Sequence, residues 1–313
     1  MFIILVTNIF SYYLPYEEKS FVSWMKSTNQ MFVGKDYDMR LGIWMSNRRL
    51  VQEHNKVSSF KLCMNKFSAH TPMEYKALLG YIPEVVTRKA LKSNYKPVDS
   101  IDWRTKGAVN SVRDQGQCGS CWAFSAIQGA ESAYFIKCGT LHKFSEQNLV
   151  DCVSTCFGCD GGLMTYALDY VINSQSGKFM LEDDYPYEEF QNACKFNSSL
   201  ATGSISSYVS IAQADEADLQ AKLSNHGPVC CGIDASLASF QLYKRGIYDD
   251  PQCSSTLLNH GVGCVGFGAE GDKKYWIIRN SWGTTWGEDG YIRMIKDKNN
   301  QCGVASGAIV PIA

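Results

Sequence analysis

Cys121 is the residue whose type and position best suit nucleophilic chemistry. It follows a glycine-broken loop in the stretch from Asp114 to Ser125, and the apolar run that starts at Trp122 predicts a buried helix to about Cys138, with Gly139 as its stop. A thiol at a helix start lies beside unpaired backbone N–H groups, which can lower its pKa from ~8.5 to ~3.5–7.5. The sequence therefore predicts a reactive thiolate.

The residues around this thiol read Cys118-Gly119-Ser120-Cys121-Trp122. This segment resembles the active-site signature of the papain family of cysteine peptidases. The resemblance implies an endopeptidase that cleaves protein and peptide substrates through a thioester on Cys121, without a metal or organic cofactor. It also implies an α+β fold in which a helical left domain and an antiparallel, β-barrel-like right domain enclose a cleft, preceded by a helical inhibitory prosegment.

Gln115 lies six residues before Cys121, across glycine-containing turns that let its side chain fold back over the thiol. Amide hydrolysis needs hydrogen-bond donors for the developing oxyanion, and the Gln115 carboxamide and the Cys121 N–H supply two. A glutamine in a loop is usually solvated, but the resemblance assigns Gln115 to the oxyanion site.

The general base should be one of five histidines. His54 and His70 fall in the presumed prosegment, His142 in a polar turn and His226 before a Gly-Pro turn, whereas His260 enters an apolar, glycine-rich strand. A lone histidine beside such a strand is more often structural than catalytic. The order of the family's residues, with a histidine between the cysteine and an asparagine, identifies His260 as catalytic.

The segment Asn280-Ser281-Trp282-Gly283 supplies a third catalytic member. A carboxamide oxygen on Asn280 that accepts the ring proton of His260 fixes the rotation and tautomer of the ring. Trp282, also expected to line the substrate site, can cover that hydrogen bond from water. In this mechanism His260 protonates the leaving amine and then activates the water that hydrolyses the thioester.

Substrate-binding residues follow from the resemblance. The doubled glycine at Gly161 and Gly162 allows close approach of an extended peptide, with Gly162 pairing to it like an added strand. The positions that match the P2 pocket are apolar and roomy without an acid at the base, so we expect bulky or branched hydrophobic P2 residues over arginine. These positions are Leu163, Met164, Gly232, Leu258, Gly261 and Gly307.

Thirteen cysteines, twelve of them after position 100, fit an oxidising compartment. The resemblance implies three disulfides, which join Cys118 to Cys159, Cys152 to Cys194 and Cys253 to Cys302. Cys138 and Cys156 have no usual counterparts and could make a fourth bridge. The three cysteines in apolar strand patterns are expected to be buried thiols: Cys230, Cys231 and Cys264.

The chain front divides into three segments. The apolar run Met1 to Phe10 predicts an imperfect or truncated secretory signal within residues 1–12, too short to span a membrane. Residues 13–95 form the expected prosegment, and Pro83 to Pro97 is its cleavable linker. Residues 96–313 form the peptidase, with a helical half at about 102–205 and a β half at about 206–313. The expected location is the secretory pathway, in lysosome-like vesicles or outside the cell, with Asn197 as a glycosylation site.

A predicted helix from about Asp36 to Asn55 is the main element of the prosegment. Six of its residues recur at spacings of three and four and so share one stripe, similar to the interspersed motif of papain-family propeptides: Asp36, Arg40, Trp44, Asn47, Val51 and Asn55. An ordinary amphipathic helix explains the pattern equally well. Asn65 and Phe67 match a second propeptide motif, but Cys63 and Ala69 replace its Gly and Asp.

The charge is unevenly divided between these parts. Residues 1–95 carry 13 Lys and Arg against 7 Asp and Glu, a net +6, whereas residues 96–313 carry 17 against 24, a net −7. A basic front and an acidic body should dock on one another, and acid should weaken the attraction by protonating body carboxylates. We expect a monomer that matures faster in acid, without a nucleic-acid partner or a membrane span.

Short runs after residue 205 predict antiparallel strands, with a hairpin tip at Ala269 to Lys273. These runs are Val229 to Ile233, Gly263 to Phe267, Tyr275 to Arg279 and Tyr291 to Ile295.

Two other functions deserve comparison with a peptidase. The pairs Cys118/Cys121 and Cys156/Cys159 formally make a double C-x-x-C zinc module, but 34 residues separate them instead of the usual ~15–20. The second alternative is a catalytically inactive papain-like binding protein. An intact set of Cys121, His260, Asn280 and Gln115 argues against it.

Overall fold

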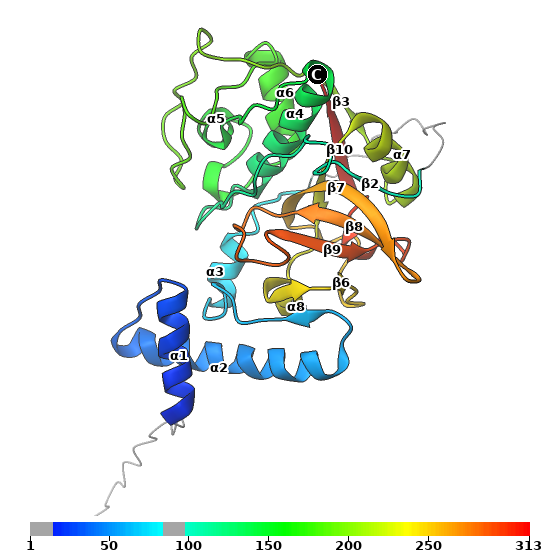
Figure 1. The fold of residues 1–313 in the computed structure, drawn as a ribbon. Coiled ribbons are helices and arrows are strands. Elements are labelled where there is room, and N and C mark those ends of the chain that lie inside the picture. Colours follow the sequence, from blue (N-terminus) through cyan, green and yellow to red (C-terminus); the bar gives the residue numbers. More distant parts are fainter. Residues whose placement is uncertain (1–14, 84–97) are drawn as a thin grey trace, which may run out of the picture.

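The computed structural model describes residues 15–83 and 98–313, and shows a helical front segment docked on a two-part body (Figure 1). The predicted signal segment and nearly all of the predicted linker lie outside the described residues. The front elements are α1 (Pro15–Ser27), α2 (Gly34–Val57), β1 (Lys61–Leu62) and α3 (Pro72–Ala77). Helix α2 confirms the predicted helix at 36–55.

The upper part of the body in Figure 1 is mainly helical. It contains α4 (Cys121–Cys138), α5 (Glu146–Cys152), the 3-10 turn η1 (Gly158–Asp160) and α6 (Met164–Ser174). Helix α4 has the predicted bounds and ends at Gly139 in the left-handed conformation. Its residues from Cys121 to Ala133 are all buried, because α4 lies between the other helices and the sheet.

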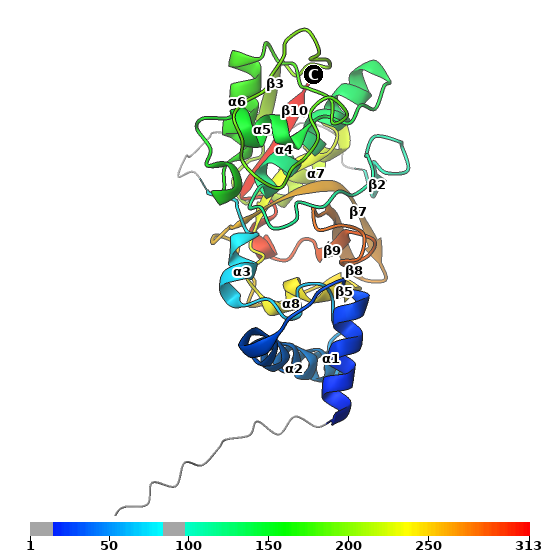
Figure 2. The ribbon, with the colours of Figure 1, turned by 90° about the vertical axis from the view of Figure 1, so that its left-hand side faces the viewer.

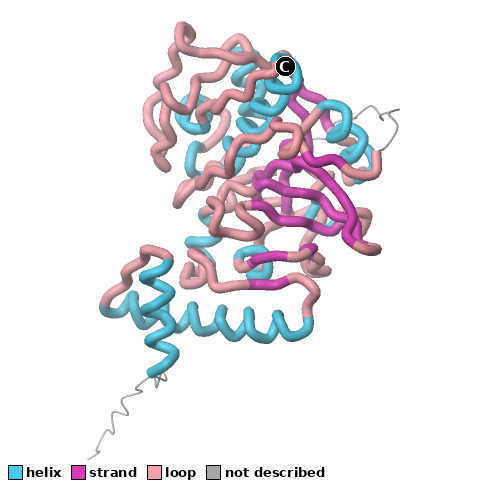
Figure 3. The backbone as a smooth tube through the Cα atoms, viewed as in Figure 1, coloured by secondary structure: helices cyan, strands magenta, loops and turns pink. Residues whose placement is uncertain are grey.

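The lower part of the body contains most of an eight-stranded sheet, drawn in magenta in Figure 3. Its order is β3-β10-β4-β7-β8-β9-β6, with β2 paired to β7. The strands are β2 (Ile101–Asp102), β3 (Ser207–Ser210), β4 (Val229–Ile233), β6 (Ile247–Tyr248), β7 (His260–Glu270), β8 (Lys273–Arg279), β9 (Tyr291–Ile295) and β10 (Gly307–Ile312). The four predicted strands are confirmed and pair antiparallel, whereas β6 pairs with β9 in parallel.

Three short elements complete the body: α7 (Glu216–His226), α8 (Ala238–Gln241) and the 3-10 turn η2 (Gln301–Gly303). Strand β5 (Tyr243–Arg245) belongs to a second sheet, in which it pairs with β1 of the front segment. The larger core contains Trp276, Trp282 and Trp286, and a second core in the helical part surrounds Trp122.

The front segment runs along the body from the β part to the helical part. In Figure 2, α2 lies below α8 and β5, and α3 rises beside the body toward the helical part. Helices α1 and α2 enclose a small core of their own, in which Phe21, Trp24 and Trp44 are buried. The C-terminal half of α2 also reaches the body, since Val51 is buried in the larger core.

Candidate active site

Cys121 begins α4, and its side chain is fully buried. Its Sγ accepts a hydrogen bond from the Gly261 N–H at 3.2 Å. Burial raises the pKa of the thiol to about 11, although N–H groups of Gly261, Gly80 and Trp122 act in the opposite direction. The predicted low pKa is thus wrong for this form of the protein, because the docked front segment removes water from a thiol that has no charged partner.

His260 is the first residue of β7, directly before the glycine that contacts the sulfur. Its Nε2 lies 2.8 Å from Asn280 Oδ1, and the Trp282 ring lies 4.7 Å from the imidazole, centroid to centroid. An oxygen acceptor at Nε2 places the ring proton there and leaves the lone pair on Nδ1. Nδ1 is buried without a hydrogen-bond partner among the described residues, and burial lowers the pKa of His260 to about 4.

Asn280 follows the last residue of β8, and its Oδ1 also accepts the Ser281 N–H at 2.8 Å. Two donors on one oxygen fix the orientation of the carboxamide. Trp282 is fully buried and covers the imidazole, as the sequence predicts for that position.

Gln115 is fully buried, and its carboxamide bonds three different segments of the chain. Ser281 Oγ donates to Oε1 at 2.7 Å, so Ser281 orients the carboxamide. Nε2 donates to the Cys118 carbonyl at 2.8 Å and to the Leu78 carbonyl at 2.9 Å. A main-chain carbonyl of the front segment therefore occupies the donor that sequence reasoning assigns to the oxyanion.

Residues Gly80 to Ile82 cross the cleft as an added strand. Gly162 donates its N–H to the Gly80 carbonyl at 2.8 Å and accepts the Ile82 N–H at 3.0 Å, with Tyr81 and Gly162 paired in parallel. The predicted pairing of an extended peptide to Gly162 is thus present, with the front segment as the peptide. A Cβ on Gly161 would lie 2.9 Å from the Gly80 carbonyl oxygen, which shows how closely the chains approach.

The Tyr81 side chain fills the predicted P2 pocket. It is buried in one cluster with Leu163, Met164 and Leu258. A Cβ on Gly232 would lie 2.5 Å from Tyr81 Cζ, and one on Gly307 would lie 2.3 Å from the Tyr81 hydroxyl. Gly261 differs from the other pocket positions, because a Cβ there would meet the Cys121 backbone first.

The stripe on α2 holds the loop that enters the cleft. Asn47 donates to the Ser68 carbonyl at 2.9 Å, and Asn55 exchanges two hydrogen bonds of 2.9 Å with the Leu62 backbone. Arg40 binds the Ala69 carbonyl at 2.9 Å and forms an ion pair with Glu74. Arg40 thus joins Ala69, which stands where the motif has Asp, to the carboxylate of Glu74.

Aromatic residues of the same loop pack against Trp282, the ring that covers His260. The Phe67 and Tyr75 rings lie 5.0 Å and 5.8 Å from the Trp282 ring. Gln241 of α8 donates to the Phe67 carbonyl at 2.8 Å and accepts the Asn65 amide at 2.8 Å. Within the described ranges, Lys66 with Asp114 is the one ion pair that joins the front segment to the body. Apolar and backbone contacts therefore dominate the docking that the charge asymmetry predicts.

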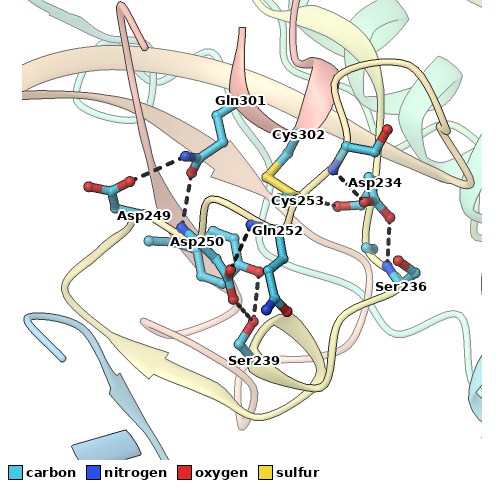
Figure 4. Close-up of a disulfide and its surroundings, with 12 residues drawn as sticks. Asp234, Ser236, Ser239, Asp249, Asp250, Gln252, Cys253, Gln301 and Cys302 are labelled. Atoms are coloured by element: carbon cyan, nitrogen blue, oxygen red, sulfur yellow. Dashed lines mark hydrogen bonds between the residues drawn. A yellow bond between two sulfur atoms is a disulfide. The ribbon is translucent and has the colours of Figure 1, made fainter. Parts of the chain in front are cut away.

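Three disulfides are present, with the pairings that the resemblance implies. Cys253–Cys302 ties the loop after β6 to η2, where Gln301 bonds Asp249 and the Asp250 N–H (Figure 4). The predicted fourth bridge between Cys138 and Cys156 does not form. Cys138 is free and exposed at the end of α4, whereas Cys156 is a free, buried thiol beside Leu163. Cys230, Cys231 and Cys264 are buried thiols, as predicted.

The same disulfides contradict a zinc module, because Cys118 and Cys159 are bonded to each other. Over the described ranges, no group of three or more His, Cys, Asp or Glu residues is placed to hold a metal ion. No helix in those ranges is long and apolar enough to cross a bilayer. Asn197 is exposed.

Sequence reasoning did not identify the residues that block the cleft, Leu78, Gly80 and Tyr81, nor Ser281 as the residue that orients Gln115. The run Leu78-Leu79-Gly80-Tyr81-Ile82 is apolar and directly precedes the linker, which is a signal for a buried segment. The pattern does not indicate that this segment binds Gln115 and Gly162.

Comparisons with known proteins agree with this geometry. Residues 97–312 match the papain family cysteine protease model, and residues 21–75 match the cathepsin propeptide inhibitor domain. Digestive cysteine proteinase 1 of Homarus americanus is 42% identical over 283 residues, 87% of each chain. Procathepsin L of Felis catus is 41% identical over 302 residues, 91% of this chain and 90% of its own.

Solved structures resemble the whole described fold. Digestive procathepsin L 3 of Tenebrio molitor larval midgut aligns with a TM-score of 0.87 at 33% identity, covering 95% of this chain and 99% of its own. The recombinant stem bromelain precursor aligns with a TM-score of 0.86 at 34% identity, covering 95% and 98%.

Proposed function

Because this chain belongs to the papain family of cysteine proteases, we propose that Cys121, His260, Asn280 and Gln115 are its catalytic residues. The protein is a cathepsin L-like cysteine protease precursor that carries its own propeptide inhibitor domain. The observation that carries the assignment is the Leu78 carbonyl, which Gln115 Nε2 binds at 2.9 Å, two residues before the Gly80 N–H that faces the Cys121 sulfur. A peptide carbonyl bound there is the group that a substrate would present.

The proposed reaction follows from these positions. Once the prosegment leaves, water reaches the thiol, and transfer of its proton to His260 Nδ1 gives a thiolate and an imidazolium held by Asn280. The sulfur attacks the substrate carbonyl, and Gln115 Nε2 and the Cys121 N–H stabilise the oxyanion. His260 protonates the departing amine, then takes a proton from the water that releases the acid and regenerates the thiol.

Treating the acid-matured protein with an epoxide thiol inactivator tests this assignment. Loss of peptidase activity should parallel alkylation of a single cysteine, and peptide mapping should place the label on Cys121. Modification of another cysteine with equal loss of activity would overturn the assignment.

The pocket around Tyr81 supports a preference for bulky hydrophobic P2 residues. We predict that Gly232→Ala lowers kcat/KM for an aromatic P2 residue by about tenfold relative to valine, because the added methyl occupies space that the ring needs. Matched peptides that differ only at P2 measure this ratio. Gly271→Ala on the hairpin tip is the control: its methyl meets no atom within 4 Å, and the strain at its φ of +59° lies outside the pocket residues, so the P2 ratio should stay unchanged. Strong preference for arginine at P2 in the unmodified enzyme would contradict the pocket assignment.

We predict that the precursor matures faster near pH 5 than at pH 7, through His54 and His70 of the prosegment. Burial lowers the pKa of both rings. At His54 the Phe60 backbone hydrogen bond and the Asp250 charge raise the pKa in opposition, whereas the Lys61 charge lowers it further. At His70 the Glu74 charge and the Gln117 hydrogen bond raise the pKa, whereas the Arg40 and Lys66 charges lower it further. Both rings are therefore less readily protonated when docked than when released, so docking weakens as the pH falls below about 6.5.

Processing rates of the precursor at the two pH values measure the effect. Replacing both histidines by glutamine should reduce the acceleration in acid, and an unchanged ratio would contradict it. The Arg40–Glu74 pair is not the trigger, because the hydrogen bond from Arg40 lowers the pKa of Glu74 to about 2 and the pair stays charged in mild acid.

We further propose that cleavage within residues 83–97 releases the mature enzyme, which acts as a monomer on protein and peptide substrates. Its proposed location is the secretory pathway, in lysosome-like vesicles or outside the cell, which the three disulfides support. The exposed Asn197 is the proposed glycosylation site.

A further inference from the structure

A small cavity lies behind the His260–Asn280 pair, where α4 meets β7 and the end of β8. It leaves about 10 Å³ for a water-sized sphere. The residues that line it include Phe124, Ser125, Gln128, Val262, Gly263 and Asn280. One water needs roughly 10–15 Å³ of such space, so the cavity has room for a single molecule.

Three of the lining side chains carry buried polar atoms without a partner in the described part of the chain. These atoms are Gln128 Nε2, Arg279 Nε and Asn280 Nδ2. Their residues are only 3%, 7% and 3% exposed. Other atoms of two of these side chains have partners outside the cavity: Arg279 Nη2 donates to the Ser111 carbonyl, and Asn280 Oδ1 accepts from His260. Polar atoms buried this deeply are normally bonded to protein or to an ordered water.

Gln128 can reach this site because residue 263 is glycine. A Cβ on Gly263 would lie 1.6 Å from Gln128 Oε1, so the carboxamide lies across that glycine. The two ends of a carboxamide have the same shape, and their assignment follows from the hydrogen bonds they make. With its oxygen at the place of the unpaired nitrogen, Gln128 presents an acceptor to the cavity that Arg279 and Asn280 also line.

We propose that one ordered water fills this cavity and that Gln128 is a positioning residue for Asn280. The water accepts the N–H groups of Asn280 Nδ2 and Arg279 Nε and donates a proton to Gln128 Oε1, which gives a partner at each of the three unpaired positions. This fixes the far end of the carboxamide whose near end holds the His260 ring. The inference rests on the proposed catalytic role of Asn280.

Replacing Gln128 by methionine, which has similar length and no hydrogen-bonding amide, removes the acceptor. We expect kcat of the matured enzyme to fall about tenfold while KM stays within about twofold, because an unsatisfied Asn280 holds the imidazolium less firmly. A hydrogen bond to the protonated ring raises the pKa of His260, so its loss should move the alkaline limb of the kcat/KM profile to lower pH.

Gln175→Met is the matched control. Gln175 is also 3% exposed with both amide atoms unpaired in the described chain, but it lies at the end of α6, away from the cavity. Its substitution should leave kcat and the alkaline limb unchanged. Unchanged kcat and pH profile in Gln128→Met would overturn the positioning role, whereas a wild-type enzyme without thiol-dependent activity would overturn the proposed function instead.

A crystal structure of the unmodified precursor tests the water without requiring any variant to fold. We expect one ordered water within hydrogen-bond distance of Asn280 Nδ2 and of the Gln128 carboxamide. An empty cavity, or a Gln128 side chain turned away from Asn280, would overturn the proposal.

Discussion

Serine in place of Cys121 is expected to lower kcat/KM of the matured enzyme by at least about 10⁴-fold. The hydroxyl has nearly the same shape, but it does not ionise at the pH where the thiol forms an ion pair with His260. The Gln115 and His260 contacts remain, so substrate should still bind. Cleavage of a peptide with a hydrophobic P2 residue and an inhibition assay with the same variant separate the two effects.

Cys138→Ser is the control for this substitution, because Cys138 is a free and exposed thiol at the other end of the same helix. It should retain wild-type activity. Substantial turnover by Cys121→Ser, with Cys138→Ser inactive, would show that the wrong sulfur has been assigned as the nucleophile.

Alanine in place of Gly80 is expected to open the cleft of the uncut precursor. Its Cβ would lie 1.7 Å from the Gly119 carbonyl oxygen and 2.5 Å from the carbon, and neither backbone atom can move aside as a flexible side chain could. The strand from Gly80 to Ile82 must therefore leave Gly162, which exposes the Cys121 thiol. We expect epoxide labelling of Cys121 at neutral pH to become about 100-fold faster.

The wild-type precursor should label slowly, because its thiol is buried with a pKa of about 11. Met73→Ala is the control on the adjacent helix, since Met73 is 80% exposed and its truncation leaves the strand in place. Electrophoresis before and after labelling verifies that each precursor is still full length. Equal labelling rates for Gly80→Ala and the wild type would mean that this strand does not close the cleft.

The pKa of the Cys121 thiol depends on a segment that is distant in the sequence. A helix start and its N–H groups can be located from the sequence, and they do surround Cys121. Burial outweighs them here, since Gly80 and its neighbours come from a segment about 40 residues upstream that covers the sulfur. In the precursor, burial thus disfavours the charged forms of both Cys121 and His260, and release of the prosegment removes that penalty.

The water cavity is a similar case. Gln128 belongs to a helix whose apolar sequence predicts burial, but nothing in its spacing relates it to Asn280, 152 positions later. Only the packing of α4 on β7, with a glycine at 263, brings the two carboxamides to one cavity.

The sequence by itself determined the elements and the chemical inventory: the bounds of α4, four strands, the stripe on α2, and the order of cysteine, histidine and asparagine. These depend on side-chain period, on glycine stops and on residue type, which act over a few positions. The tertiary structure alone decided that Leu78 meets Gln115, that Tyr81 packs among Leu163, Met164 and Leu258, that Cys138 and Cys156 stay apart, and that burial raises the thiol pKa in the precursor. Each of these depends on which distant segments exclude water from one another, and burial of that kind has no local pattern.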